Sequence, residues 1–201
     1  MESLEGKFDT RRGKASLGQR FYESLVKKTL ESLEGKFDKE NLGCLYMDIK
    51  KYLGNLGIEY KLHKHPPVYT CEESEKIKVI MKGMHAKSLL VKGKSTGNFY
   101  MVIIPCEERI DRKKLKNHIE EDITFANSEE LDKLLSLKPG SVSPFAIIND
   151  KNNKITIIFS RKVWESEILN FHPNINTETI ELKNKEFTKY INSLKNKIII
   201  M

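Results

Sequence analysis

The chain has 201 residues, and lysine plus arginine outnumber aspartate plus glutamate by 35 to 28, which gives a net charge of +7 and a pI near 9.1. This length predicts one domain, with or without an appendage, that is large enough for a real core, and the basic balance favours a polyanionic partner such as nucleic acid. No apolar run reaches the ~18 residues that span a bilayer and the N-terminus lacks the apolar core of a signal peptide, so we expect no membrane association and a cytoplasmic location.

The cysteines, Cys44, Cys71 and Cys106, are odd in number and far apart in sequence. Their spacing predicts neither a disulfide framework nor a zinc finger, and it favours a reducing compartment. Walker, GxGxxG, HExxH and GxSxG motifs are absent from the sequence, so we expect neither a cofactor nor a metal.

An octapeptide, ESLEGKFD, occurs at residues 2–9 and again at residues 31–38. Two copies in a polar region do not predict a repeat architecture, because a solenoid needs several stacked units to bury a core. We interpret residues 1–42 as an N-terminal extension, partly helical or disordered, and residues 43–197 as the folded domain. The apolar end, Ile198 to Met201, we expect to mark a truncation or a partner contact.

The domain opens with apolar residues at helical spacing from Leu45 to Leu56, followed by Gly57 as a C-terminal cap. Residues 58–62 alternate between apolar and polar and predict a strand that ends before two prolines. Thr70 and Glu73 have the spacing of a capping box, which predicts a helix from residue 71 to about residue 81.

Two apolar runs, at residues 87–92 and 99–105, are joined by a turn-like GKSTGN segment and predict a hairpin. Asp111 is placed to cap one helix. Asn127, with a glutamate three residues later, is placed to cap a second helix that reaches Leu135.

The segment Lys138 to Asp150 runs from a proline and a glycine into an apolar stretch. Gly140 allows a sharp turn, small residues follow it, and Pro144 stiffens the exit. From these residues alone, a tight helix-to-strand connection is the simpler interpretation. The alternative is a loop whose main-chain N–H groups bind a ligand.

The remaining pattern predicts strands at residues 145–150 and 154–160, a further strand at 177–182, and an amphipathic helix at 187–194. Together the elements predict a mixed α/β domain with about six short strands, mostly in hairpins, and helices between them.

Five segments, HPPVYTCEE, GMHAKSLLVK, FYMVIIPCEERIDRKKL, LKPGSVSPFAIIND and NFHPNINTETIEL, resemble in order and spacing the YbaK/prolyl-tRNA deacylase family. They are most similar to its free-standing alanyl-tRNA(Pro) deacylase branch, ProX or PrdX, and related domains occur in prolyl-tRNA synthetases. The resemblance runs from Met47 to Leu194. It implies an α/β (α+β) fold with a YbaK-like mixed β-sheet curved into a partial barrel, flanked by helices.

The resemblance also implies the site. Lys87 matches the lysine that holds the terminal adenosine and its phosphate, Gly140 opens the family's GxxxP loop, and His172 matches the histidine of its HP motif; we expect these three to be catalytic. The expected substrate-binding residues are His65, Thr70, Ser88, Ser141, Val142, Ser143 and Pro144. Ser88 departs from the asparagine often found after the lysine. Because His63, His65 and His85 lack placed carboxylates, we do not expect a metal site.

The implied function is a trans-editing deacylase that hydrolyses Ala-tRNA(Pro) with a backbone-positioned water in a small, size-excluding pocket. We assign no side chain as general base. Two alternatives remain: a Cys-tRNA(Pro) deacylase, and a tRNA-binding, editing-like domain of a prolyl-tRNA synthetase. The expected partners are the acceptor end of tRNA(Pro) carrying alanine and prolyl-tRNA synthetase, in trans or fused.

Overall fold

The computed structural model describes residues 49–67 and 81–201, all of which belong to the unit Glu40–Met201. The predicted extension at residues 1–42, Thr70 and all but the end of the helix expected from residue 71 lie outside the described residues.

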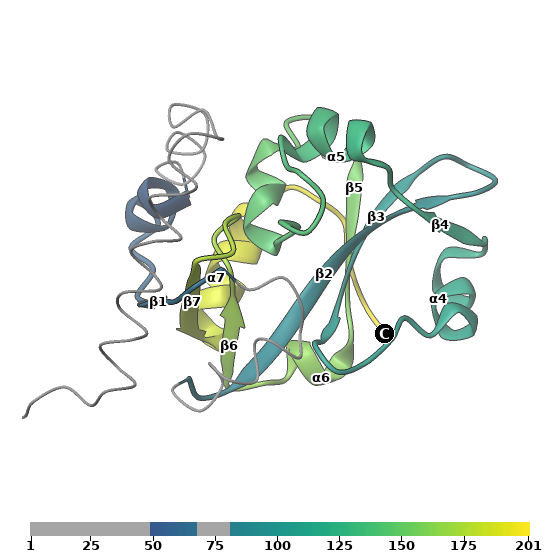
Figure 1. Cartoon of the computed structure of the whole chain (residues 1–201). Coiled ribbons are helices and arrows are strands. Elements are labelled where there is room, and N and C mark those ends of the chain that lie inside the picture. The colour runs from purple at the N-terminus through teal and green to yellow at the C-terminus, as the bar shows by residue number, and fades with distance from the viewer. Residues whose placement is uncertain (1–48, 68–80) are drawn as a thin grey trace, which may run out of the picture. The chain divides into compact units, whose positions relative to one another are not determined.

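Strand β2 (Met84–Gly93) organises the sheet, because three strands pair with different parts of it. It pairs antiparallel with β3 (Phe99–Pro105) along most of its length, which confirms the predicted hairpin. Its first residues pair parallel with β6 (Ile168–Phe171), and its last residues pair antiparallel with β4 (Ile123–Phe125). Figure 1 shows β2 crossing the domain diagonally between these neighbours.

The described strands form one eight-stranded mixed sheet in the order β1-β7-β6-β2-β3-β5-β8, with β4 paired beside β2. The remaining strands are β1 (Lys61–Lys64), β5 (Ile155–Phe159), β7 (Glu178–Lys183) and β8 (Ile198–Ile200). The sheet is open and flanked by helices, which confirms the predicted mixed α/β class.

The helices begin where the caps predict. Asp111 accepts hydrogen bonds from the first turn of α4 (Arg112–Ile119), and Asn127 forms a capping box at α5 (Ser128–Leu135). Satisfying these otherwise unpaired N–H groups stabilises a helix start by about 1 kcal/mol. A short helix α6 (Arg161–Trp164) follows β5, and α7 (Asn184–Ser193) confirms the predicted amphipathic helix.

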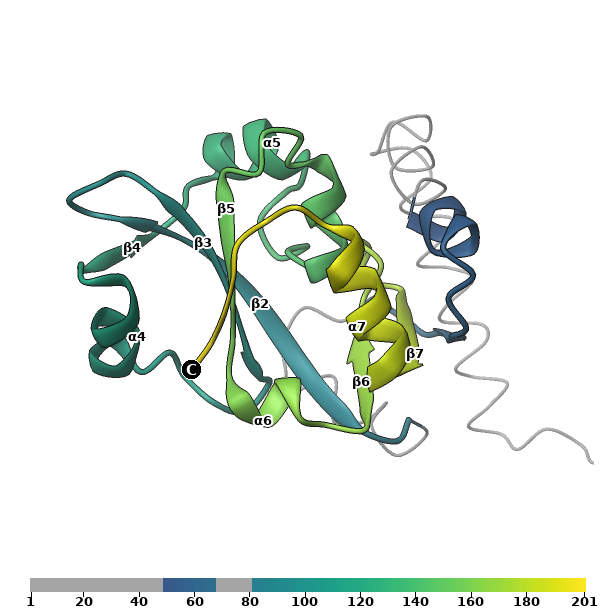
Figure 2. The same ribbon diagram turned by 180° about the vertical axis from the view of Figure 1, so that it is seen from behind.

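The core has two parts, one on each face of the sheet. The larger is built of buried residues from β6, β7, α5 and α7, and the aromatic rings of Phe145, Phe187 and Tyr190 lie within it. Figure 2 shows α7 lying over β6 and β7. The smaller part lies on the other face, where Leu115 of α4 packs near Val91 and Val102.

The strand predicted at residues 145–150 is wrong, because residues Pro144–Asn149 form a 3₁₀ helix, η1. Pro144 opens it, and the Ser143 hydroxyl accepts a hydrogen bond from the Phe145 N–H. The segment is buried along most of its length, so its sequence shows no alternation that would separate helix from strand. The apolar residues from Ile198 pair parallel with β5 as strand β8, a role that the sequence did not predict.

Candidate active site

The loop from Lys138 to Pro144 leaves α5 and enters η1, between two elements that pack on each other. Gly140 has a φ of +87°, a region that side chains with a Cβ rarely adopt. A Cβ placed there would meet nothing within 4 Å. The glycine is therefore required by the backbone conformation of the turn and not by crowding.

Two hydrogen bonds hold the exit of this loop. The buried Ser143 hydroxyl donates to the backbone oxygen of His172 at 2.6 Å. The hydroxyl of Tyr190, on α7, donates to the backbone oxygen of Pro144 at 2.9 Å. The loop is thus fixed to the end of β6 on one side and to the last helix on the other.

His172 follows β6 and is half-buried, with its Nδ1 atom buried and without a hydrogen-bond partner. Burial lowers the pKa of His172 to about 4; a hydrogen bond with the backbone of Val142 opposes this, and the charge of nearby His65 adds to it. The imidazole is therefore neutral at pH 7, with one ring nitrogen that donates a hydrogen bond and one that accepts.

His65 lies at the end of β1 and is held in place through both ring nitrogens. Its Nε2 atom bonds to the Thr179 hydroxyl at 2.9 Å and its Nδ1 atom to the backbone oxygen of Pro66 at 2.8 Å. The structure thus brings together four of the predicted residues: His65, Val142, Ser143 and His172.

Lys87 lies on β2, in register with Ile104 of β3, and is half-buried. Its ammonium group donates to the backbone oxygen of Cys106 at 2.8 Å. No hydrogen bond among the described residues joins Lys87 to the loop, so its fixed contact is with the end of β3. Cys106 is disulfide-bonded, a pairing that the cysteine spacing did not predict.

Ser88 is the next residue on β2, and successive side chains of a strand point to opposite faces. It is buried and its hydroxyl has no hydrogen-bond partner. The structure therefore places Ser88 on the other face of the strand from Lys87.

A row of polar residues across the sheet was missed from the sequence. Asn170 of β6 is in register with Glu181 of β7 and with His85 of β2. Burial works to raise the pKa of Glu181, but hydrogen bonds from Lys61 and His63 outweigh it and lower the pKa. Alternation of apolar and polar residues along β6 could have indicated Asn170, but this short strand was not predicted.

The predicted histidines do not form a metal site with these residues. His63 bonds to the Glu181 carboxylate at 3.0 Å, and His65 bonds to a hydroxyl and a backbone oxygen. Within residues 49–67 and 81–201, no group of three His, Cys, Asp or Glu side chains is placed to hold a metal ion.

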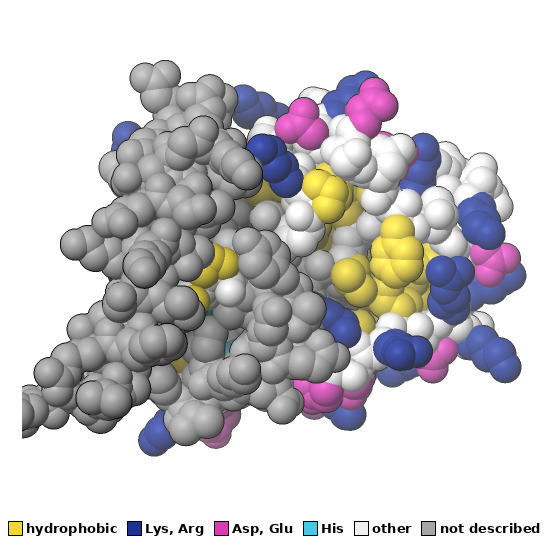
Figure 3. All heavy atoms as spheres, in the orientation of Figure 1, with side chains coloured by type: hydrophobic (Ala, Val, Ile, Leu, Met, Phe, Trp, Pro, Cys, Tyr) yellow, Lys and Arg dark blue, Asp and Glu magenta, His cyan; other side chains and the backbone are white. Residues whose placement is uncertain are grey.

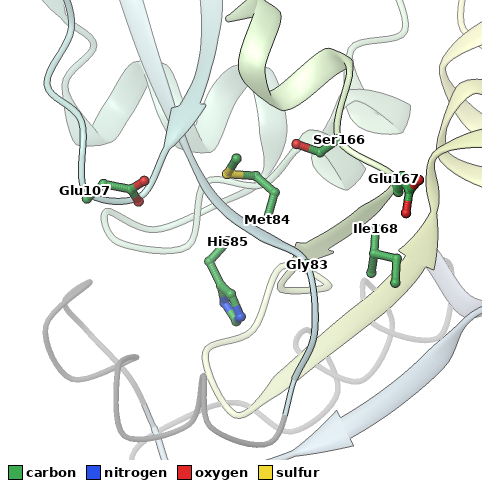
Figure 4. Close-up of a pocket in the computed structure, with 7 residues that line it drawn as sticks. All are labelled: Gly83, Met84, His85, Glu107, Ser166, Glu167 and Ile168. Atoms are coloured by element: carbon green, nitrogen blue, oxygen red, sulfur yellow. The ribbon is translucent and has the colours of Figure 1, made fainter.

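A cavity of about 670 Å³ opens where β2 and β6 begin (Figure 4). Met84 and His85 point to opposite sides of β2, and Met84 faces Ser166. The lining residues are Gly83, Met84, His85, Glu107, Ser166, Glu167 and Ile168. None of the predicted site residues that the structure describes lines it, and neither the loop nor its anchors Ser143, His172 and Tyr190 belong to it.

On the described part of the face that Figure 3 shows, Lys and Arg side chains are most numerous on the right-hand side, where a few Asp and Glu side chains lie among them and apolar side chains lie beside them. None of the helices in the described ranges is long and apolar enough to cross a membrane.

Comparison with protein families gives a match over most of the described domain. The profile of the aminoacyl-tRNA editing domain matches residues 65–190. This range includes the loop, its anchors Ser143, His172 and Tyr190, and Lys87.

Two curated relatives align over most of their own length. The prolyl-tRNA editing protein ProX of Acetoanaerobium sticklandii is 32% identical over 140 residues, which cover 69% of this chain and 85% of the relative. The Mus musculus prolyl-tRNA synthetase associated domain-containing protein 1 is 24% identical over 162 residues, which cover 78% of this chain and 95% of the relative.

Solved structures share the fold at low identity. A crystal structure described as a candidate trans-editing enzyme for prolyl-tRNA synthetase superposes with a TM-score of 0.62 at 16% identity, covering 78% of this chain and 95% of that one. The crystal structure of hypothetical protein APE2540 gives the same TM-score at 17% identity, covering 76% and 97%.

Proposed function

This chain belongs to the aminoacyl-tRNA editing domain family, and on that premise we propose that it is a trans-editing deacylase that hydrolyses the ester bond of mischarged tRNA(Pro). The observation that carries the proposal is the 32% identity to a prolyl-tRNA editing protein along 85% of that protein's length. Residues 65–190 include both the lysine and the anchored loop that the reaction would use.

Hydrolysis of an aminoacyl ester needs few catalytic side chains. An aminoacyl ester is already activated, so its hydrolysis needs an oriented water, donors for the developing oxyanion and a fixed substrate. Main-chain N–H groups of the Gly140–Pro144 loop would supply the donors, except that of Ser141, which donates to the Lys138 backbone oxygen, and that of Pro144, which does not exist. The exit of the loop is held by hydrogen bonds at Ser143 and Pro144. A loop fixed in this way needs no reorganisation when charge develops on the substrate.

Lys87 would hold the terminal adenosine through its phosphate. Its ammonium is a compact cation with three donors, one of which is committed to the Cys106 backbone oxygen. The other two donors can meet phosphate oxygens while the first keeps the side chain in place.

His172 would orient the substrate or the water as a neutral group. With a pKa near 4 it carries no charge at pH 7, so it adds no electrostatic attraction for phosphate. Its Nδ1 atom has no hydrogen-bond partner but is buried, so the ring would have to shift for this atom to bond to a substrate. We assign no general base, because such a low pKa makes His172 a weak one.

We propose alanine as the amino acid removed. One or two methylenes give only ~1–3 kcal/mol of discrimination, so a synthetase for proline will sometimes attach the smaller alanine. A pocket too small for the proline ring would hydrolyse that error and spare the correct product. Cysteine on the same tRNA is the alternative substrate, and an assay that compares the three esters separates the possibilities.

We further propose prolyl-tRNA synthetase as the partner that supplies the mischarged tRNA, in trans or in a fused chain, and the cytoplasm as the place of action. The test of the function is hydrolysis of Ala-tRNA(Pro) by the purified chain. Failure to release alanine under conditions in which the chain is folded would exclude the proposed reaction.

A further inference from the structure

The loop is anchored by a residue far from it in sequence and outside the set that the family resemblance assigned. Tyr190 lies on α7, 46 residues after Pro144, and its hydroxyl donates to the Pro144 backbone oxygen at 2.9 Å. Both the donor and the acceptor residue are buried. Water cannot easily replace a hydrogen bond in such a place, so its loss leaves a buried carbonyl unsatisfied.

The ring of Tyr190 has little freedom to move. It makes edge contacts with Phe145, at a centroid distance of 5.2 Å, and with Tyr52, at 6.1 Å, and a tilted contact with Phe187, at 6.2 Å. The hydroxyl is therefore presented at a fixed position by ring packing. Burial also raises the pKa of Tyr190 well above 10, so the hydroxyl stays a donor throughout the physiological range.

The two hydrogen bonds at the loop exit join it to two different elements of the fold. The Ser143 hydroxyl bonds to the backbone that follows β6, whereas the Pro144 carbonyl accepts from Tyr190 of α7. The two bonds together fix the position and the orientation of the loop that begins at Gly140. A site that works through main-chain N–H groups loses rate when those groups shift by a fraction of an ångström. It would also lose size exclusion, because under the proposed function the same backbone bounds the amino-acid pocket.

We propose that Tyr190 is a positioning residue that sets the width of the amino-acid pocket by holding the Pro144 carbonyl, and so controls discrimination against the larger prolyl ester. This inference rests on the proposed function and deepens it. Tyr190 does not touch the substrate; it acts through the loop.

The test is Tyr190→Phe, which removes one oxygen atom and keeps the ring packing. We expect kcat for Ala-tRNA(Pro) to fall about tenfold with KM changed less than twofold. We also expect the ratio of kcat/KM for Ala-tRNA(Pro) to that for Pro-tRNA(Pro) to fall at least tenfold. This ratio does not depend on the fraction of active protein, so partial misfolding of the variant would not change it.

Tyr52→Phe is the matched control. It removes a hydroxyl from a neighbouring ring of the same aromatic cluster, but that hydroxyl bonds to Ser193 of α7 at 3.0 Å and not to the loop. We expect its alanine-to-proline ratio to equal that of the wild type.

The outcomes separate the two proposals. If the wild type hydrolyses Ala-tRNA(Pro) and Tyr190→Phe keeps the wild-type ratio, the positioning role is overturned while the function stands. The positioning role is also overturned if Tyr52→Phe lowers the ratio equally, because the effect would then come from general loosening. If the wild type hydrolyses none of the esters, the proposed function fails and the role of Tyr190 fails with it.

Discussion

The Ser143 hydroxyl and the His172 backbone oxygen are joined by a hydrogen bond of 2.6 Å, which links two motifs that lie 29 residues apart in sequence. The GxxxP loop and the HP motif are therefore one structural unit. A change in either motif is expected to move the other, so substitutions in the two should not be additive.

Substitutions along the loop separate main-chain from side-chain chemistry. Gly140→Ala forces a Cβ into a φ of +87° at a cost of about 1–3 kcal/mol, and Ser143→Ala leaves the His172 oxygen without its donor. We expect each to lower kcat/KM for Ala-tRNA(Pro) at least tenfold, and Ser141→Ala, whose hydroxyl bonds to no described residue, to lower it less than threefold. If Ser141→Ala were the most damaging of the three, a hydroxyl would be doing the chemistry.

Lys87→Ala tests the proposed phosphate contact. Loss of a charge-assisted hydrogen bond costs about 1.5–3 kcal/mol, so kcat/KM should fall about 10- to 100-fold while the thermal midpoint changes little. Lys92→Ala is the control, because Lys92 lies on the same strand and pairs with Glu130 at 2.8 Å. Wild-type turnover by Lys87→Ala would refute the assignment of this lysine.

His172 predicts a pH dependence of stability. Its pKa is about 4 when folded and near 6.5 when unfolded, so between these values the unfolded state binds more protons. The stabilisation is complete above pH 6.5 and is lost as the pH falls towards 4. The loss should be about 2 kcal/mol, less than the full linkage value because the side chain is only half-buried.

The measurement is the free energy of unfolding from urea titrations at pH 4.5 and pH 7 for the wild type and His172→Asn. The variant has no imidazole to protonate at this position, so its free energy of unfolding should fall less over this interval. The Asp and Glu carboxylates that titrate in the same range are present in both proteins and contribute equally to both. Equal losses in the two proteins would mean that His172 is not buried as a neutral group.

Local signals in the sequence were sufficient for the elements that have them. The caps at Asp111 and Asn127 predicted α4 and α5, and the two apolar runs on either side of the turn-like residues 93–98 predicted the β2–β3 hairpin. Where the signal is tertiary, the sequence was insufficient. The segment Pro144–Asn149 is buried on most sides, so its composition does not distinguish a strand from the observed 3₁₀ helix.

In the site, too, the sequence indicated the features with a local signal and missed those that depend on tertiary contacts. The resemblance indicated the loop and His172, and the structure places Ser143 against His172. The Tyr190 contact with Pro144 could not be found in this way, because spacing along α7 shows only that Tyr190 faces the core. The sequence pattern likewise contains no sign that Lys87 bonds to the Cys106 backbone, since that oxygen belongs to the end of the next strand.

The most direct test of the central claim is a deacylation panel, in which the purified full chain is incubated with Ala-tRNA(Pro), Cys-tRNA(Pro) and Pro-tRNA(Pro) and the released amino acid is measured over time. We predict rapid release of alanine, with release of proline at least 100-fold slower. Fast release of cysteine with slow release of alanine would move the specificity to the alternative substrate. Equal hydrolysis of the alanyl and prolyl esters, or hydrolysis of neither, would contradict the proposed function.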